Sequence, residues 1–355
     1  MKRTLLMSLL FISTALTAGV AWASPPVRVS PGVSATVASL APGTRANVTS
    51  PRGKIAFVRG GHIWIMNANG TSPRRLTNAT AHDSGLTWTA NGKRITFLRR
   101  AKDAYGFYSI YRGVWSVKAT GGGLRPIRGL PTPASRIVSI AWSPKGRYLA
   151  IARDYYGTSQ GSKKALAVID MHTGHVRFVR VFDSGWNGAI GRVAWSPSGK
   201  KLVLEARVTA GPFDPSFRFF SLATVDLSSG KFTELDLDAF PQSVDFFDVV
   251  WQPFGKYLIS VALDESPTSS WRSKLEVLTP DGTPVRALQV LAAKPDANCG
   301  LTLGDCSPDG RWVAVGVDDS SARGSVRHST VLLSLDGSTQ RTLTTRGSQP
   351  AFSPR

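Results

Sequence analysis

Short apolar runs separated by turn residues follow one another along most of the chain. Ile55–Val58, Ile63–Met66 and Val331–Leu335 are examples, each followed by a cluster of Gly, Asn, Asp or Ser. Runs of this length bounded by such residues are typical of β-strands. Because the runs are continuously apolar more than alternating, we expect sheets that are packed on both faces. The pattern predicts an all-β protein.

One motif recurs between these strands: an aromatic residue, then Ser-Pro-x-Gly-Lys/Arg, then a new apolar run. Its aromatic position is taken by Trp88, Trp142, Trp195, Trp251 and, as an exception, Cys306. Successive copies are 54, 53, 56 and 55 residues apart. A regular period with four strands in each repeat is typical of the blades of a β-propeller.

The two ends of the chain carry complementary halves of this motif. Residues 351–355 (AFSPR) form its first half, and residues 50–57 (SPRGKIAF) form its second half. A ring in which the C-terminal strand completes the N-terminal blade explains this division and removes unpaired sheet edges. We therefore predict an all-β, six-bladed β-propeller of four-stranded blades over residues 53–355, closed by the C-terminal strand joining the N-terminal blade.

The repeats also resemble a known family. Residues 54–57 (KIAF), 63–70 (IWIMNANG) and 74–77 (RRLT), together with the W-S-P-x-G-K/R turns, are similar to the repeats of TolB-type, WD-repeat-like β-propellers. The resemblance covers about residues 53–355 and implies the propeller fold. It does not extend to the α/β domain of TolB, because only about 30 residues separate the apolar N-terminus from the first repeat.

The N-terminus predicts export. A basic start at Lys2 and Arg3, an apolar run from Leu5 to Val20 and an Ala-Trp-Ala end indicate a signal peptide over residues 1–23, cleaved after Ala23. An uncleaved anchor is the alternative, although the run is short for a membrane span. Residues 24–52, rich in Ser, Pro, Ala, Val and Gly, are interpreted as a flexible leader. We expect a periplasmic or extracellular mature chain without a transmembrane segment.

Charge and cysteine content refine this picture. The 43 Lys and Arg against 23 Asp and Glu give a net charge of +20, which favours attachment to an anionic cell-envelope polymer. No base-reading motif is present, so no sequence-specific nucleic acid is expected. In an oxidising compartment, Cys299 and Cys306 are expected to form a disulfide that braces the loop into the last blade. Two free buried thiols are the alternative.

The loops that lead into the innermost strands should place side chains around the mouth of the central channel. The candidates are His82, Asp83, Arg136, Arg192, Asp245, Asp248 and Gln349. A ring of mixed charge would bind a small polar ligand, a metal or the extended tail of a partner. A water-filled rim with compensating charges is the alternative.

The longer, variable loops share one face of the predicted ring and are rich in aromatic residues and arginine. The candidates on this loop face are Tyr105, Tyr108, Tyr155, Tyr156, Trp271 and Arg272. Such side chains are enriched at interaction hot spots, so they would form a recognition face. Alternatively, they pack on their own blades.

These observations favour an exported, non-catalytic, monomeric propeller that binds a protein partner or an envelope polymer through its loop face, without a cofactor. The competing hypothesis is a metal-dependent propeller enzyme of the lyase or lactonase type, with its site in the channel. His62, His82 and His328 would be its metal ligands, from a chain with only five histidines. A glycan-binding module that uses Tyr155, Tyr156 and Trp271 is a third hypothesis.

Overall fold

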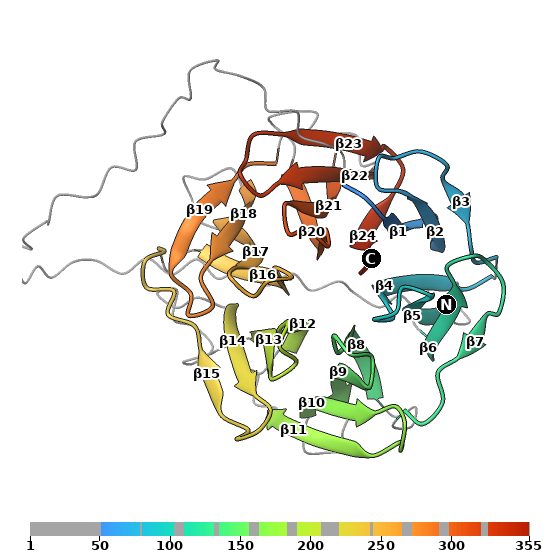
Figure 1. Cartoon of the computed structure of the whole chain (residues 1–355), viewed down its shortest axis with the longest axis horizontal. Helices are drawn as coiled ribbons and strands as arrows, with labels where there is room; N and C mark the ends of the chain where they lie inside the picture. The colour runs from blue at the N-terminus through green and yellow to red at the C-terminus, as the bar shows by residue number, and fades with distance from the viewer. Residues whose placement is uncertain are drawn as a thin grey trace, which may run out of the picture. The chain divides into compact units, whose positions relative to one another are not determined.

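The computed structural model describes residues 51–78, 80–102, 110–130, 135–155, 163–182, 190–206, 220–241, 244–264, 272–290, 298–320 and 326–354. These residues form six antiparallel sheets of four strands each. Figure 1 shows the sheets arranged as blades around a central opening. The domain is a six-bladed β-propeller, which confirms the fold that the repeat predicts.

The four strands of each blade lie side by side, from an innermost strand at the axis to an outermost strand at the rim. Blade 1 contains, in this order, β24 (Ser348–Phe352), β1 (Lys54–Arg59), β2 (His62–Asn67) and β3 (Arg74–Arg75). Blade 2 contains β4 (His82–Trp88), β5 (Arg94–Ala101), β6 (Ile110–Lys118) and β7 (Arg125–Pro126). Blade 3 contains β8 (Ser135–Trp142), β9 (Tyr148–Tyr155), β10 (Lys163–Asp170) and β11 (Val176–Phe182).

The second half of the ring follows the same order. Blade 4 contains β12 (Ile190–Trp195), β13 (Lys201–Ala206), β14 (Ser221–Asp226) and β15 (Phe232–Glu234). Blade 5 contains β16 (Val244–Trp251), β17 (Leu258–Asp264), β18 (Arg272–Leu278) and β19 (Pro284–Leu288). Blade 6 contains β20 (Asn298–Cys306), β21 (Trp312–Ser320), β22 (Val326–Ser334) and β23 (Gln340–Thr344).

The C-terminal strand closes the ring. β24 pairs with β1, with Phe352 opposite Ile55 and Ala351 opposite Ala56. The backbone N–H of Ser353 donates to the carbonyl of Lys54 at 2.8 Å, next to this pairing. The predicted closure of the N-terminal blade by the C-terminal strand is thus confirmed.

The recurrent Ser-Pro-x-Gly motif builds the hairpin between the first and second strands of a blade. In blade 6, the Ser307 hydroxyl accepts the backbone N–H of Trp312 at 3.0 Å, and Gly310 has a φ of 64°. The left-handed φ explains why the turn uses glycine. At the closing junction, the Ser353 hydroxyl accepts the N–H of Lys54 at 3.0 Å. The chain ends therefore reproduce the hydrogen bond of a continuous turn.

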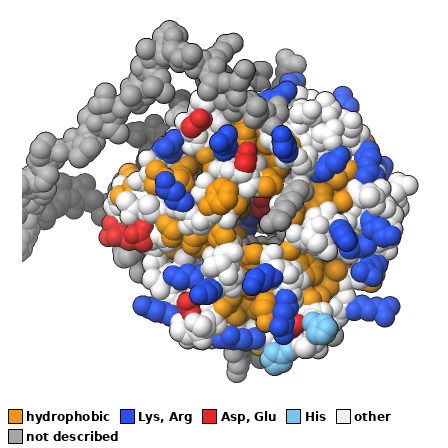
Figure 2. All heavy atoms as spheres, viewed as in Figure 1, with side chains coloured by type: hydrophobic (Ala, Val, Ile, Leu, Met, Phe, Trp, Pro, Cys, Tyr) orange, Lys and Arg blue, Asp and Glu red, His pale blue; other side chains and the backbone are white. Residues whose placement is uncertain are grey.

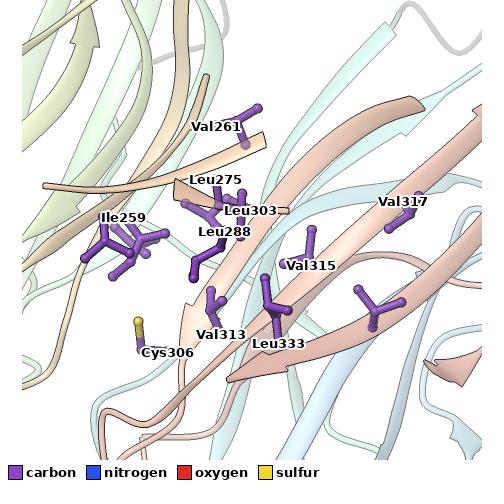
Figure 3. Close-up of a cluster of buried hydrophobic side chains, with 13 residues drawn as sticks. Ile259, Val261, Leu275, Leu288, Leu303, Cys306, Val313, Val315, Val317 and Leu333 are labelled. Atoms are coloured by element: carbon purple, nitrogen blue, oxygen red, sulfur yellow. The ribbon is translucent and has the colours of Figure 1, made fainter. Parts of the chain in front are cut away.

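The core lies between adjacent blades. In the cluster between blades 5 and 6, Ile259 and Leu275 pack with Val313, Val315 and Leu333. Figure 3 shows these side chains projecting from the facing sheets into the space between them, with the sulfur of Cys306 near one end of the cluster. Burial of both faces of each blade explains why the strands are continuously apolar.

The predicted disulfide is wrong, because Cys306 is a free, buried thiol. Cys299 and Cys306 lie on the same strand, β20, where they pair with Asp319 and Val313 respectively. A strand advances by about 3.3 Å per residue, so their Cα atoms are far beyond the roughly 7 Å limit for a disulfide. Burial raises the pKa of the Cys306 thiol, and the neighbouring carboxylate of Asp305 raises it further.

Within the described ranges, no helix has both the length and the apolar character needed to cross a membrane.

Candidate functional site: the central channel

A channel of about 1180 Å³ lies along the axis of the propeller. All six innermost strands contribute to its wall, and the hairpins that follow them surround one opening. The prolines of these hairpins, Pro144, Pro197, Pro253, Pro308 and Pro354, are part of the lining. The repeat therefore creates a continuous cavity that side chains from every blade can reach.

A β-bulge interrupts each innermost strand. The register with the second strand shifts at Val138 in β8 and at Asp248 in β16, for example. Gly85, Asp248 and Gln349 each precede the aromatic residue of the turn motif by three positions, and they have φ values of 57°, 43° and 47°. Bulges turn a side chain away from the regular alternation of a strand. Here the bulge residues of all the blades line the channel: Gln349, Gly85 with Leu86, Val138, Arg192, Asp248 and Asp305.

We call these bulge residues, together with Glu205 of β13, the collar. The collar is chemically uneven. Leu86 and Val138 make its wall apolar on blades 2 and 3, whereas Arg192, Asp248 and Asp305 make it charged on blades 4, 5 and 6. At the collar, a ligand would therefore meet apolar side chains on one side and ionised groups on the other, while Arg100 of β5 adds a cation to the lining on blade 2.

Arg192 connects three blades. Its guanidinium donates to the carbonyl of Leu303 and to Asp305 Oδ1, the latter at 3.3 Å, and it lies 4.0 Å from Asp248 Oδ2. Asp248 Oδ2 accepts the backbone N–H of Leu303 at 2.9 Å. These bonds between blades hold the charged side chains in fixed positions along the channel.

Glu205 lies beneath the bulge of β12. Arg192 and Gly191 occupy the bulge opposite it, and a Cβ on Gly191 would come within 2.4 Å of the Glu205 carboxyl carbon. The carboxylate accepts the backbone N–H of Asp248 at 3.1 Å. Burial raises the pKa of Glu205 to about 7, and the charge of Asp248 adds to the shift, against the lowering effect of Arg192. This acid thus titrates near neutral pH.

Gln349 links the closing strand to blade 2. Its side-chain oxygen accepts the backbone N–H of Gly85 at 2.8 Å, so one bulge is bonded to the next. Both residues have positive φ, which glycine adopts readily and glutamine does not. Gln349 thus has a strained backbone at the position from which its side chain lines the channel and joins two blades.

Three of the predicted channel residues line the channel: Arg192, Asp248 and Gln349. They do so from bulges within the inner strands, not from the loops before them. His82, at the start of β4, is outside this lining, and burial lowers its pKa. A binding role for these residues stays a proposal.

The structure corrects the expected positions of Asp83 and Asp245. Both precede the bulge in their strands and are buried, with exposed fractions of 0% and 3%. Asp83 forms an ion pair with Arg99 within blade 2, at 2.7 Å. Asp245 accepts the backbone N–H of Phe220 at 2.9 Å. Successive side chains of a strand point to opposite faces of the sheet. The side chains of Asp83 and Asp245 therefore form their hydrogen bonds inside the blades.

The role of the loop-face candidates stays a prediction. Tyr105, Tyr108, Tyr156 and Trp271 lie outside the described residues. The backbones of Arg136, Tyr155 and Arg272 belong to β8, β9 and β18, but their side chains also lie outside what is described.

Sequence reasoning missed Glu205 and Asp305. The bulge residues Gly85, Arg192, Asp248 and Gln349 all lie three positions before the turn aromatic, a spacing that the repeat already contains. Asp305 departs from it because it directly precedes Cys306. One feature of the sequence points to Glu205, namely that it is a lone acid within an apolar strand. The bulge at Gly191 that faces it is apparent only from the strand register.

For a metal centre, the described part of the chain contains no group of three or more His, Cys, Asp or Glu side chains suited to hold an ion. His328, one of the three histidines considered as ligands, instead lies 2.7 Å from Asp318 Oδ1.

Comparison with known proteins supports the fold. No family model matches the chain. A stretch of 103 residues is 38% identical to the Tol-Pal system protein TolB of Gluconobacter oxydans (strain 621H), and it covers 28% of this chain but only 22% of that protein.

Solved structures extend the likeness over most of the propeller. TolB from Acinetobacter baumannii gives a TM-score of 0.60 at 17% identity, over 85% of this chain and 67% of that chain. A putative TolB from Agrobacterium tumefaciens gives 0.56 at 16% identity, over 85% and 92%. At such identities the likeness shows the fold alone. The described residues form a TolB-like β-propeller.

Proposed function

We propose that the chain is an exported, non-catalytic propeller that binds a protein partner through the channel and the loop face around its mouth. The likeness to TolB supports this proposal, because that relative is named as a protein of the Tol-Pal system. The basic, apolar N-terminus with its Ala-Trp-Ala end supports export, with residues 1–23 as signal peptide and 24–52 as leader.

The observation that carries the proposal is the collar. Arg192, Asp248 and Gln349 are each hydrogen-bonded to the backbone of another blade, so their positions are set before any ligand arrives. Preorganised groups lose little conformational freedom on binding. An extended peptide combines charged and apolar side chains with main-chain hydrogen-bonding groups, and it suits a collar that is apolar on one side and charged on the other.

One observation favours a second candidate, an enzyme. Glu205 has a pKa of about 7 and lies among Arg192, Asp248 and Asp305 in the channel wall. Acids with such pKa values are candidates for proton transfer. However, its carboxylate accepts backbone N–H groups of two blades, a structural use that requires no substrate. We therefore favour binding over catalysis.

The proposal is tested by capture of partners from cell-envelope extract at low and high salt. The variant Val138→Trp narrows the channel from its apolar side, and Val285→Trp makes the same change on the outermost strand β19. We expect wild type and Val285→Trp to retain a protein at high salt and Val138→Trp to lose it, with all three equally folded. Equal retention by all three would refute channel binding, and capture of a polymer without protein would refute a protein partner.

The enzyme candidate has its own test. If the channel is catalytic, extract incubated with wild type yields a product that Glu205→Gln does not form. If the channel only binds, both proteins leave the extract unchanged and capture the same partner.

A further inference from the structure

The hairpins that join the first and second strands of the blades lie together on one side of the ring, at the opposite strand ends from those that lead into the connections between second and third strands. They comprise residues 89–93, 143–147, 196–200, 252–256 and 307–311, with the junction of Ser353 and Lys54 in the sixth position. We call this side the turn face. Its composition is set by the repeat, so any property of the motif appears around the whole ring.

Every junction on the turn face carries an exposed cation. These cations are Arg52 and Lys54 at the closing junction, then Lys93, Arg147, Lys200, Lys256 and Arg311. Lys93, Lys200 and Arg311 form no ion pair with any residue in the described ranges. Figure 2 looks onto this side and shows many more Lys and Arg than Asp and Glu side chains.

The hairpins that carry these cations share one backbone geometry. Each of the five continuous hairpins has the same length and the same bond, in which the glycine N–H donates to the carbonyl three residues earlier at 2.8 Å. The hairpins also pack on each other: a Cβ on Gly199 would meet Pro144 Cδ at 3.8 Å, and one on Gly255 would meet Pro197 at 3.7 Å. The turn face is therefore a rigid, level ring.

An exposed aromatic ring stands among these charges. Phe254, in the hairpin of blade 5, is 70% exposed, the highest value for a large hydrophobic side chain in the described ranges. Its ring lies against Gly310 of the next hairpin, where a Cβ would meet Phe254 Cε2 at 3.0 Å. The contact holds the aromatic ring in place while leaving it open to solvent. Hydrophobic side chains also gather around the central opening in Figure 2.

Aspartates share this side of the molecule, mostly at larger radius. Asp170, Asp226 and Asp336 lie in the outer hairpins, and their carboxylates accept hydrogen bonds from those same turns. Asp170 also pairs with Arg147 at 2.7 Å. Among the described residues of the hairpins that join first and second strands, the one acid is Asp309, whose carboxylate accepts from the N–H of Arg311 at 3.2 Å. The surface around the opening is thus strongly cationic.

We propose that the turn face docks on a lipid bilayer rich in anionic phospholipid, with its cations at the headgroups and Phe254 inserted between them. A level ring of charges can meet a planar anionic surface at every blade simultaneously, whereas a single acidic chain would cross only part of the ring. Cations near an anionic membrane each strengthen binding, and aromatic side chains anchor at the interface. Docking in this way leaves the loop face directed away from the bilayer.

The test is sedimentation with vesicles of phosphatidylcholine containing phosphatidylglycerol, and with vesicles of phosphatidylcholine alone. The chain starting at Ser24 is compared with a turn-face variant, Lys93→Gln, Lys200→Gln and Arg311→Gln, which removes one cation from blades 2, 4 and 6. The matched control, Arg128→Gln, Arg327→Gln and Arg346→Gln, removes three exposed charges near the loop face. All proteins keep the same leader.

We expect the partition coefficient of the turn-face variant on anionic vesicles to fall about 100-fold, because each of the three removed charges contributes roughly fivefold. The control should lose little, because its charges are about a strand length, roughly 20 Å, from the surface, beyond the screening length. Phe254→Ser should weaken binding without any change of charge. Equal losses in the two triple variants, or equal binding to both kinds of vesicle, would overturn the proposal. A further outcome would also overturn the proposal. If soluble polyglutamate displaced the protein completely from the vesicles and Phe254→Ser had no effect, the turn face would be assigned to an acidic polypeptide.

Discussion

Replacing Asp83 by alanine should destabilise the propeller strongly. Arg99 Nε and Nη2 donate to the two carboxylate oxygens of Asp83 at 2.7 and 2.8 Å, and the side chains are 6% and 0% exposed. The Thr77 hydroxyl donates to the same carboxylate at 2.7 Å and accepts the N–H of Ile63 at 2.9 Å. This network joins blade 2 to blade 1, so its loss affects the interface beside the closing blade.

The magnitude follows from leaving a buried charge unpaired. Removal of one partner of a buried ion pair costs about 3–5 kcal/mol of the free energy of unfolding, whereas apolar replacement of both partners is often neutral. We therefore expect Asp83→Ala to lose about 3–5 kcal/mol and the double variant Asp83→Ala, Arg99→Met to recover much of that loss. The ring of Trp115, whose centroid is 4.9 Å from the Arg99 guanidinium, can pack against the methionine.

Urea denaturation monitored by tryptophan fluorescence measures both free energies of unfolding. A loss below about 1 kcal/mol in Asp83→Ala, or a double variant less stable than the single one, would refute a structural role for the pair. If Asp83→Ala instead retained full stability but lost partner capture, the prediction of Asp83 as a binding residue would be restored.

Three further predictions concern the collar and the turns. The pKa of Glu205 is about 7 in the folded chain, against 4.5 as its ordinary value. Between these pH values the folded chain keeps a proton that the unfolded chain has released. The free energy of unfolding should therefore fall by about 3 kcal/mol as the pH rises through this window. Glu205→Gln should remove that slope in denaturation curves recorded from about pH 4.5 to 8, and an unchanged slope would contradict the assignment. Gly191→Ala should cost about 1–3 kcal/mol because its Cβ would overlap the Glu205 carboxylate, and a neutral effect would argue against this close approach. Ser307→Ala should lower the free energy of unfolding by about 1–3 kcal/mol in the same denaturation assay, because the buried N–H of Trp312 loses its acceptor. The control is Ser338→Ala, in an exposed turn, which should be about as stable as wild type.

The sequence predicted the fold because a propeller repeats its local signals. The Ser-Pro-x-Gly turns set the hairpins, and the half-motifs at residues 50–57 and 351–355 indicated the closure that the pairing of Ile55 with Phe352 confirms. Each of these features depends on residues close together in the chain. Such local patterns can be read without knowledge of the packing between blades.

The candidate site was predicted less well, because a bulge decides which side chains face the channel. Asp83 and Asp248 both belong to inner strands, yet the first is buried beside Arg99 and the second lines the channel from a left-handed bulge position. The disulfide prediction failed for a related reason. Cys299 and Cys306 are close in sequence, but both lie in the extended strand β20, which keeps them far apart in space. Strand continuity and register emerge only from tertiary structure.

Hydrogen–deuterium exchange of the chain, alone and with its captured partner, tests partner binding through the channel most directly. We expect the partner to slow exchange in the inner-strand segments around Arg192, Asp248 and Gln349. Exchange should also slow in segments 156–162 and 207–220, which connect the second and third strands of blades 3 and 4, while β7, β15 and β19 at the periphery exchange as before. Slower exchange confined to these peripheral strands, with the channel segments unchanged, would contradict it.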